Sequence, residues 1–95
     1  MTEIANNLPA TLQEAARLLQ GLVPEVEQSR IAGMKEEALT LLHFGLGQWI
    51  RNNLGLWQKE SALLAATGES HPDDASAVII TALWHRLRED LPRVH

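Results

Sequence analysis

One stretch of the sequence constrains the fold more than any other. Every position from Ala38 to Lys59 lacks an acidic side chain, and hydrophobic residues recur there at helical spacing. One side of the predicted helix carries Leu39, Leu42, Leu46, Trp49, Ile50 and Asn53. Leu41 and Phe44 project to the opposite side, so the helix from Leu39 to Asn53 is apolar nearly all round. Such a helix is surrounded by others or used in an interface, and we expect it to organise the molecule.

Capping signals and hydrophobic spacing predict further helices on both sides. Thr11 followed by Glu14 is a capping box that starts a helix reaching Val23. The other predicted helices run from Glu25 to Ile31, from Lys59 to Ala66 and from Pro72 to Leu91. Ser70 or His71 caps the last of these, and Pro92 ends it. Its predicted buried stripe is Ile79, Ile80, Leu83, Trp84, Leu87 and Leu91.

No segment shows the sustained two-residue alternation of a half-buried strand. The expected fold class is therefore all-α, with four to five short helices in a compact orthogonal bundle. A chain of 95 residues suits one domain, so we expect a single domain over residues 1–95 with an ordered core at residues 9–92.

Composition and charge limit the compartment and the partners. The chain has no cysteine, which fits a reducing compartment, and we expect a cytoplasmic protein. Neither a signal-peptide pattern at Met1 to Pro9 nor a run long enough to cross a bilayer is present, so no membrane role is expected. The net charge of −4 disfavours nucleic acid. The cations that could still gather on one face are Arg51, Lys59, Arg86, Arg88 and Arg93.

Two sequence blocks carry a resemblance to a known family. They are HFGLGQWIRNNLGLW at residues 43–57 and HPDDASAVIITALWHRL at residues 71–87. Together they resemble an uncharacterised family of small bacterial proteins, a domain of unknown function, over roughly Pro9 to Leu91. The resemblance implies a capped first helix, a helix carrying the first block and a last helix capped at Pro-Asp-Asp. It implies no activity, substrate or catalytic residues.

The first candidate site lies along one flank of the central helix, where His43, Gly47 and Arg51 recur at four-residue spacing. Gly47 would leave a notch between two cation-capable side chains that could hold a carboxylate or phosphate. The structural alternative is that Gly47 lets a neighbouring helix approach closely while Arg51 pairs with an acid such as Asp73. Both interpretations stay open at the level of sequence.

Large apolar side chains form the second candidate site. Trp49 and Trp84 lie on predicted buried stripes and are expected in the core, whereas Phe44 and Trp57 fall off those stripes. Phe44 with Leu41 is the expected exposed apolar patch, and such a patch on a small protein marks association. Aromatic side chains and Arg are also favoured at interface hot spots.

Two further patterns imitate chemistry. The HPDD sequence at residues 71–74 contains metal-ligand types, but it is also a good helix start on capping and dipole grounds. The row Thr81, His85 and Glu89 imitates a nucleophile, base and orienter. A mid-helix Thr usually bonds back to the preceding turn, and no oxyanion donors are evident. We expect no catalytic residue, no metal site, no cofactor and no enzymatic activity.

These features favour a protein-interaction module, of the immunity, antitoxin or inhibitor kind, that acts by surface binding. Its partner is another protein or a second copy in a homodimer. The predicted binding residues are His43, Phe44, Gly47, Gln48, Arg51, Asn52 and Trp57. The alternative is a small anion- or metal-binding helical domain that uses the flank of His43, Gly47 and Arg51.

Overall fold

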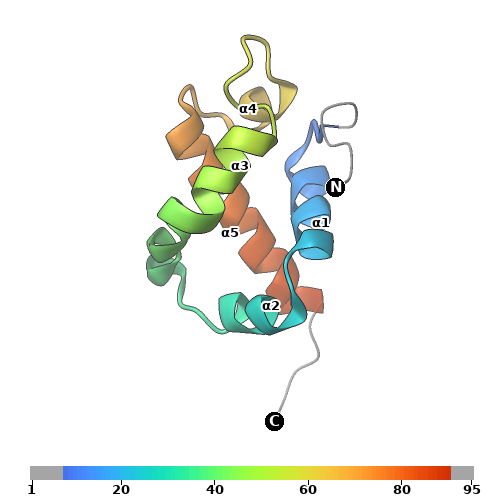
Figure 1. The fold of residues 1–95 in the computed structure, drawn as a ribbon, viewed down its shortest axis with the longest axis vertical. Helices are drawn as coiled ribbons and strands as arrows, with labels where there is room; N and C mark the ends of the chain where they lie inside the picture. Colours follow the sequence, from blue (N-terminus) through green and yellow to red (C-terminus); the bar gives the residue numbers. More distant parts are fainter. Residues whose placement is uncertain (1–7, 91–95) are drawn as a thin grey trace.

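The computed structural model describes residues 8–90, which contain helices and no strand (Figure 1). The elements are α1 (Leu12–Leu22), α2 (Glu25–Ala32), the 3₁₀ segment η1 (Glu36–Leu42), the π-helical turn η2 (His43–Gly47), α3 (Gln48–Asn53), α4 (Ala62–Thr67) and α5 (Pro72–Asp90). The predicted all-α class is confirmed, and η1, η2 and α3 follow one another without a break.

The first helix begins where its capping box predicts. The Thr11 hydroxyl accepts a hydrogen bond from the Glu14 amide at 3.0 Å, and the Glu14 carboxylate accepts one from the Ala10 amide at 2.8 Å. The helix ends at Leu22, because Val23 has extended backbone angles and Pro24 is the N-cap of the next helix. Leu22 therefore lies at the C-terminal end of this helix and is 41% exposed.

A buried glutamine joins the first two helices. The Gln28 amide nitrogen donates to the backbone oxygens of Gln20 at 2.8 Å and Val23 at 2.7 Å. These carbonyls lie at the C-terminal end of α1, where helical backbone oxygens lack intrahelical partners. The short second helix is confirmed. Its one buried polar side chain, Gln28, provides hydrogen bonds to backbone oxygens at the end of α1.

The central segment differs from the single α-helix predicted over Leu39 to Asn53. The segment begins at Glu36 and passes through a 3₁₀ segment and a π turn before α3 completes it. Asn53 was predicted on the buried stripe but is exposed, and its side chain donates to the Trp49 carbonyl at 2.9 Å. Leu39, Leu42 and Ile50 are buried, while Leu46 and Trp49 are partly buried against the core.

Side-chain caps set the starts of the last two helices. The Ser61 hydroxyl accepts from the Leu64 amide at 3.0 Å, so α4 begins at Ala62 and not at the predicted Lys59. His71 caps α5, because its Nδ1 accepts from the Asp73 amide at 3.0 Å. The predicted end of this helix at Leu91 and Pro92 lies outside the described residues.

The expectation that the central segment organises the molecule is wrong, because α5 does so. This helix runs through the middle of the molecule and packs against α1, α2, η1, η2, α3 and α4 (Figure 1). Its buried residues are Ala75, Ser76, Ile79, Ile80, Leu83, Trp84 and Leu87. The Trp84 indole also donates to the Met34 carbonyl at 2.9 Å, which ties α5 to the connection before η1. No helix within residues 8–90 combines the length and apolarity needed to span a bilayer.

Candidate functional site

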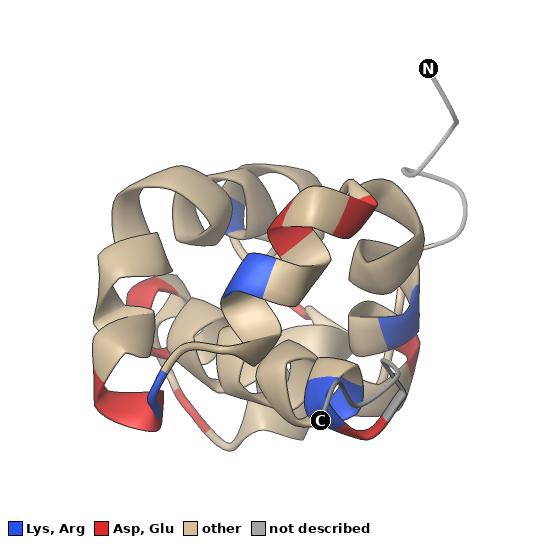
Figure 2. Ribbon diagram, turned by 90° about the horizontal axis from the view of Figure 1, so that it is seen from below, with Lys and Arg blue, Asp and Glu red and all other residues tan. Residues whose placement is uncertain are grey.

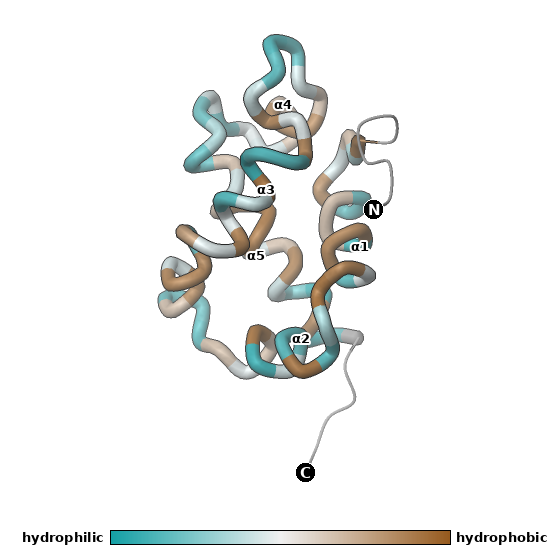
Figure 3. Tube along the Cα trace, viewed as in Figure 1, coloured by the Kyte–Doolittle hydropathy of each residue, from teal (hydrophilic) through white to brown (hydrophobic). Residues whose placement is uncertain are grey.

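Large apolar side chains stand in solvent on the outer side of the central segment. Phe44 is 82% exposed and Leu41 is 76% exposed, and three-residue spacing makes them neighbours on the helical surface. Gln48 and Asn52 continue this exposed side along α3. We call these four residues the Phe44 surface. Figure 3 colours the chain by hydropathy. Hydrophobic turns of η1 and η2 lie at the edge of the molecule, and other hydrophobic turns lie at its centre.

Phe44 lies in the π turn η2. This π turn contains Gly45 and Gly47, and isolated π turns recur at functional sites in helices. The Phe44 ring and the neighbouring His43 ring meet edge to face, with centroids 5.3 Å apart and planes at 85°. Phe44 is therefore largely exposed to solvent, while His43 is half-buried beside it.

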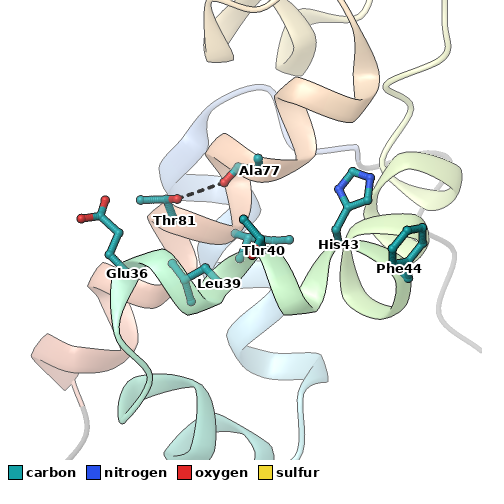
Figure 4. A pocket seen from close by; sticks show the side chains of 8 residues that line it. Glu36, Leu39, Thr40, His43, Phe44, Ala77 and Thr81 are labelled. Atoms are coloured by element: carbon teal, nitrogen blue, oxygen red, sulfur yellow. Dashed lines mark hydrogen bonds between the residues drawn. The ribbon is translucent and has the colours of Figure 1, made fainter.

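A hollow of about 360 Å³ lies between the central segment and α5 (Figure 4). Its lining is Glu36, Leu39, Thr40, His43, Phe44, Ala77, Ile80 and Thr81. Glu36 lies at one end, His43 and Phe44 lie at the other, and Ala77 and Thr81 come from α5 (Figure 4). The volume is within the range of sites that hold small organic groups.

A second hollow, of about 350 Å³, lies on the other side of the same segment, against α2. Leu41 lines it together with Leu42, Gly45 and Leu46, and Ile31 lies on the α2 side. Arg30 and Glu27 on its rim pair with each other at 2.6 Å. Leu41 and Phe44 thus form a ridge with one hollow on each side.

At Gly47 and Arg51, the flank has the contacts of the structural alternative: an ion pair with Asp73 and close packing against α5. Arg51 is buried and its Nε lies 3.2 Å from the Asp73 carboxylate. Its Nη1 donates to the Ser76 hydroxyl at 3.1 Å, and that hydroxyl donates to the Asp73 carbonyl at 2.9 Å. A Cβ on Gly47 would lie 3.1 Å from Arg51 Nη1 and 3.6 Å from Ile80 Cδ1. The space beside Gly47 therefore holds the guanidinium and α5, so Arg51 and Gly47 present no open anion site.

Trp57 lies beyond the end of α3 and is 58% exposed. Its ring meets the edge of the His71 ring, with centroids 5.7 Å apart. The predicted exposure of Phe44 and Leu41 is confirmed, and so is the burial of Trp84. The exposure of Trp57, which the sequence left open, is settled by the structure. Trp49 is only partly buried, packed against the core.

The two patterns that imitate chemistry have structural partners. Asp73 pairs with Arg51, and His71 caps α5, its Nδ1 3.9 Å from the Asp73 carboxylate. Thr81 donates back to the Ala77 carbonyl at 3.0 Å, and no hydrogen bond within residues 8–90 connects it to His85. No group of three His, Asp or Glu side chains in this part of the chain is placed to hold a metal ion.

The cations do not form a continuous band on the view in Figure 2. Arg51 is buried, Arg86 bonds to Gln20, and Arg88 donates to the Ala32 carbonyl at 3.1 Å while lying over the Trp84 ring. Arg93 lies outside the described residues. Most of the basic residues considered for nucleic-acid binding are thus engaged within the protein.

Sequence reasoning missed the α5 side of the first hollow. Glu36 belonged to none of the predicted sites, and Thr81 belonged only to the row that imitates a catalytic triad. Their proximity depends on how η1 packs against α5, and no spacing along the chain reports that packing.

These features define a small all-α protein with an exposed apolar ridge between two hollows. The chain belongs to the family named domain of unknown function (DUF6794), whose model matches residues 8–87. The resemblance inferred from the two sequence blocks is confirmed. No curated protein and no solved structure matches the chain.

Proposed function

We propose that this protein is an interaction module that binds a partner protein through the Phe44 surface and acts by occupying or blocking that partner, without chemistry. The observation that carries the proposal is the exposure of two adjacent large apolar side chains, Phe44 at 82% and Leu41 at 76%. An immunity protein, an antitoxin or an inhibitor would act in this way.

The energetics support this assignment. Burying one such side chain contributes about 1.5 to 3 kcal/mol, so an uncovered pair forgoes a substantial stabilisation. Gln48 and Asn52 continue the surface with uncharged hydrogen-bonding groups, as is common around the apolar centre of an interface. We do not propose anion binding at the flank of Arg51, because its guanidinium already pairs with Asp73 and Ser76.

The test compares Phe44→Asp with Val26→Asp. Val26 is 79% exposed on α2 and lines neither hollow, so it is a matched apolar control. Each variant and the unaltered protein serve as bait in native cell extract, after circular dichroism has verified the fold. We expect one protein to be captured by the unaltered chain and by Val26→Asp, and to be lost with Phe44→Asp.

Sedimentation at micromolar concentration adds a second arm, because a copy of the same chain could cover the surface through a two-fold axis. A dimer that Phe44→Asp converts to a monomer identifies the partner as a second copy. Capture and self-association that are both unchanged by Phe44→Asp would show that the Phe44 surface is not the binding surface.

A further inference from the structure

The polar groups around the first hollow, between the central segment and α5, are mainly hydrogen-bond acceptors. The Thr81 hydroxyl donates to the Ala77 carbonyl at 3.0 Å, and the Thr40 hydroxyl donates to the Glu37 carbonyl at 3.4 Å. Each hydroxyl has a single proton, so its oxygen can offer only lone pairs to a ligand. The Glu36 carboxylate is exposed and has no hydrogen bond or ion pair within residues 8–90.

The rest of the lining is apolar. Leu39 and Ile80 are buried residues of this lining. Ala77 comes from α5, and Phe44 lies at the end away from Glu36 (Figure 4). His43 is the one further ionisable side chain of the lining, at the end opposite Glu36 (Figure 4). An apolar lining with an unpaired carboxylate at one end matches a group that is apolar along its length and cationic at its tip.

We propose that this hollow receives, from the partner protein, a large apolar side chain next to a Lys or Arg whose charged head pairs with Glu36. The inference rests on the proposed function and names the chemistry of the partner segment. The overall charge agrees with it, because a protein of net charge −4 attracts a cationic partner. Lys and Arg can lay their methylene stems over apolar surface while their heads remain in water, which suits a hollow open to solvent.

Three small probes that share one ring and differ in charge test the inference. They are phenethylamine, 2-phenylethanol and phenylacetate, titrated at neutral pH into isotopically labelled protein by NMR. We expect amide shifts at Thr40, His43 and Thr81, with phenethylamine binding about threefold to fivefold more tightly than the alcohol. Phenylacetate is expected to bind most weakly. Glu36→Gln should lower the affinity for phenethylamine to that for the alcohol and leave the alcohol unchanged.

Glu37→Gln is the matched control, because Glu37 is adjacent, exposed and outside the lining of the hollow. It should preserve the preference for the amine. Equal binding of amine and alcohol, a preference that survives Glu36→Gln, shifts confined to other residues, or no binding of any probe would each overturn the inference. Suppose that Phe44→Asp abolishes partner binding but the hollow shows no preference for the amine. The proposed function would then stand, and only the inference that the partner presents a cationic group would be wrong.

Discussion

At the scale of single residues, Arg51 determines how the central segment meets α5. Its side chain is 10% exposed, and its charge is offset by a half-exposed Asp73 and by the Ser76 hydroxyl. A buried charge left without its partner is costly, whereas a carboxylate at the surface can be rehydrated. The two ends of this ion pair are therefore unequal in their importance for stability.

Replacing Asp73 should destabilise the fold more than replacing the acid beside it. Asp73→Asn leaves the buried guanidinium without its counter-charge, and Asp74→Asn removes only a favourable charge at the start of α5. We expect Asp73→Asn to lower the free energy of unfolding by about 1 to 2 kcal/mol more than Asp74→Asn, less than a fully buried pair because Asp73 is half-exposed. Urea denaturation measures both variants, and equal losses would contradict this role for Arg51.

Residue types and spacing left two interpretations of Arg51 open for a definite reason. Helical periodicity shows which residues share a flank, but it does not show what packs against that flank. The Phe44 surface was easier to predict, because Leu41 and Phe44 fall on the side opposite the predicted core stripe. Exposure thus followed from one helix alone, whereas the pairing of Arg51 required knowledge of α5.

At the scale of elements, the central segment is not a uniform α-helix. α-helical spacing nevertheless predicted most of its buried positions correctly. The 3₁₀ segment η1 turns more tightly than an α-helix, and the π turn η2 turns more loosely. The two departures oppose each other, so Leu39, Leu42 and Ile50 still share the inner side. The buried positions of the central segment could therefore be predicted from the sequence, but its 3₁₀ and π geometry could not.

The two glycines of η2 should respond oppositely to alanine. A Cβ on Gly45 would meet no atom within 4 Å, so Gly45→Ala should raise the free energy of unfolding by about 0.5 to 1 kcal/mol by restricting the unfolded chain. A Cβ on Gly47 would press on Arg51, which Ser76 and Asp73 hold in place.

We therefore expect Gly47→Ala to lower the free energy of unfolding by about 1 kcal/mol, as overpacking does. Thermal and urea denaturation of the two variants under the same conditions give the comparison. Stabilisation of Gly47→Ala equal to that of Gly45→Ala would show that Arg51 moves aside without cost.

At the scale of the whole molecule, α5 is the element on which the other helices depend. Leu83 lies fully buried in α5, whereas Leu41 is 76% exposed. Leu83→Ala should lower the free energy of unfolding by about 2 to 5 kcal/mol, and Leu41→Ala should change it by less than about 0.5 kcal/mol. Denaturation followed by circular dichroism tests both, and a similar loss for the two variants would contradict the assignment of the core.

The fold class and most helix starts could be predicted from sequence because caps and periodicity are local. The identity of the organising helix could not. Apolar content made the central segment look dominant, yet part of that content, Leu41 and Phe44, faces outward. In α5, small buried residues such as Ala75 and Ser76 instead allow close packing, and they add little to any hydrophobicity count.

The position of α5 in the chain has a consequence for how the protein is made. Residues 72–90 follow every other described helix, so the ribosome synthesises them after those helices. Until they emerge, the faces of α1, α2 and the central segment that pack against α5 remain uncovered by it. The nascent chain therefore passes through a stage in which both its future core and its Phe44 surface are open to water, and completion of α5 closes only the first.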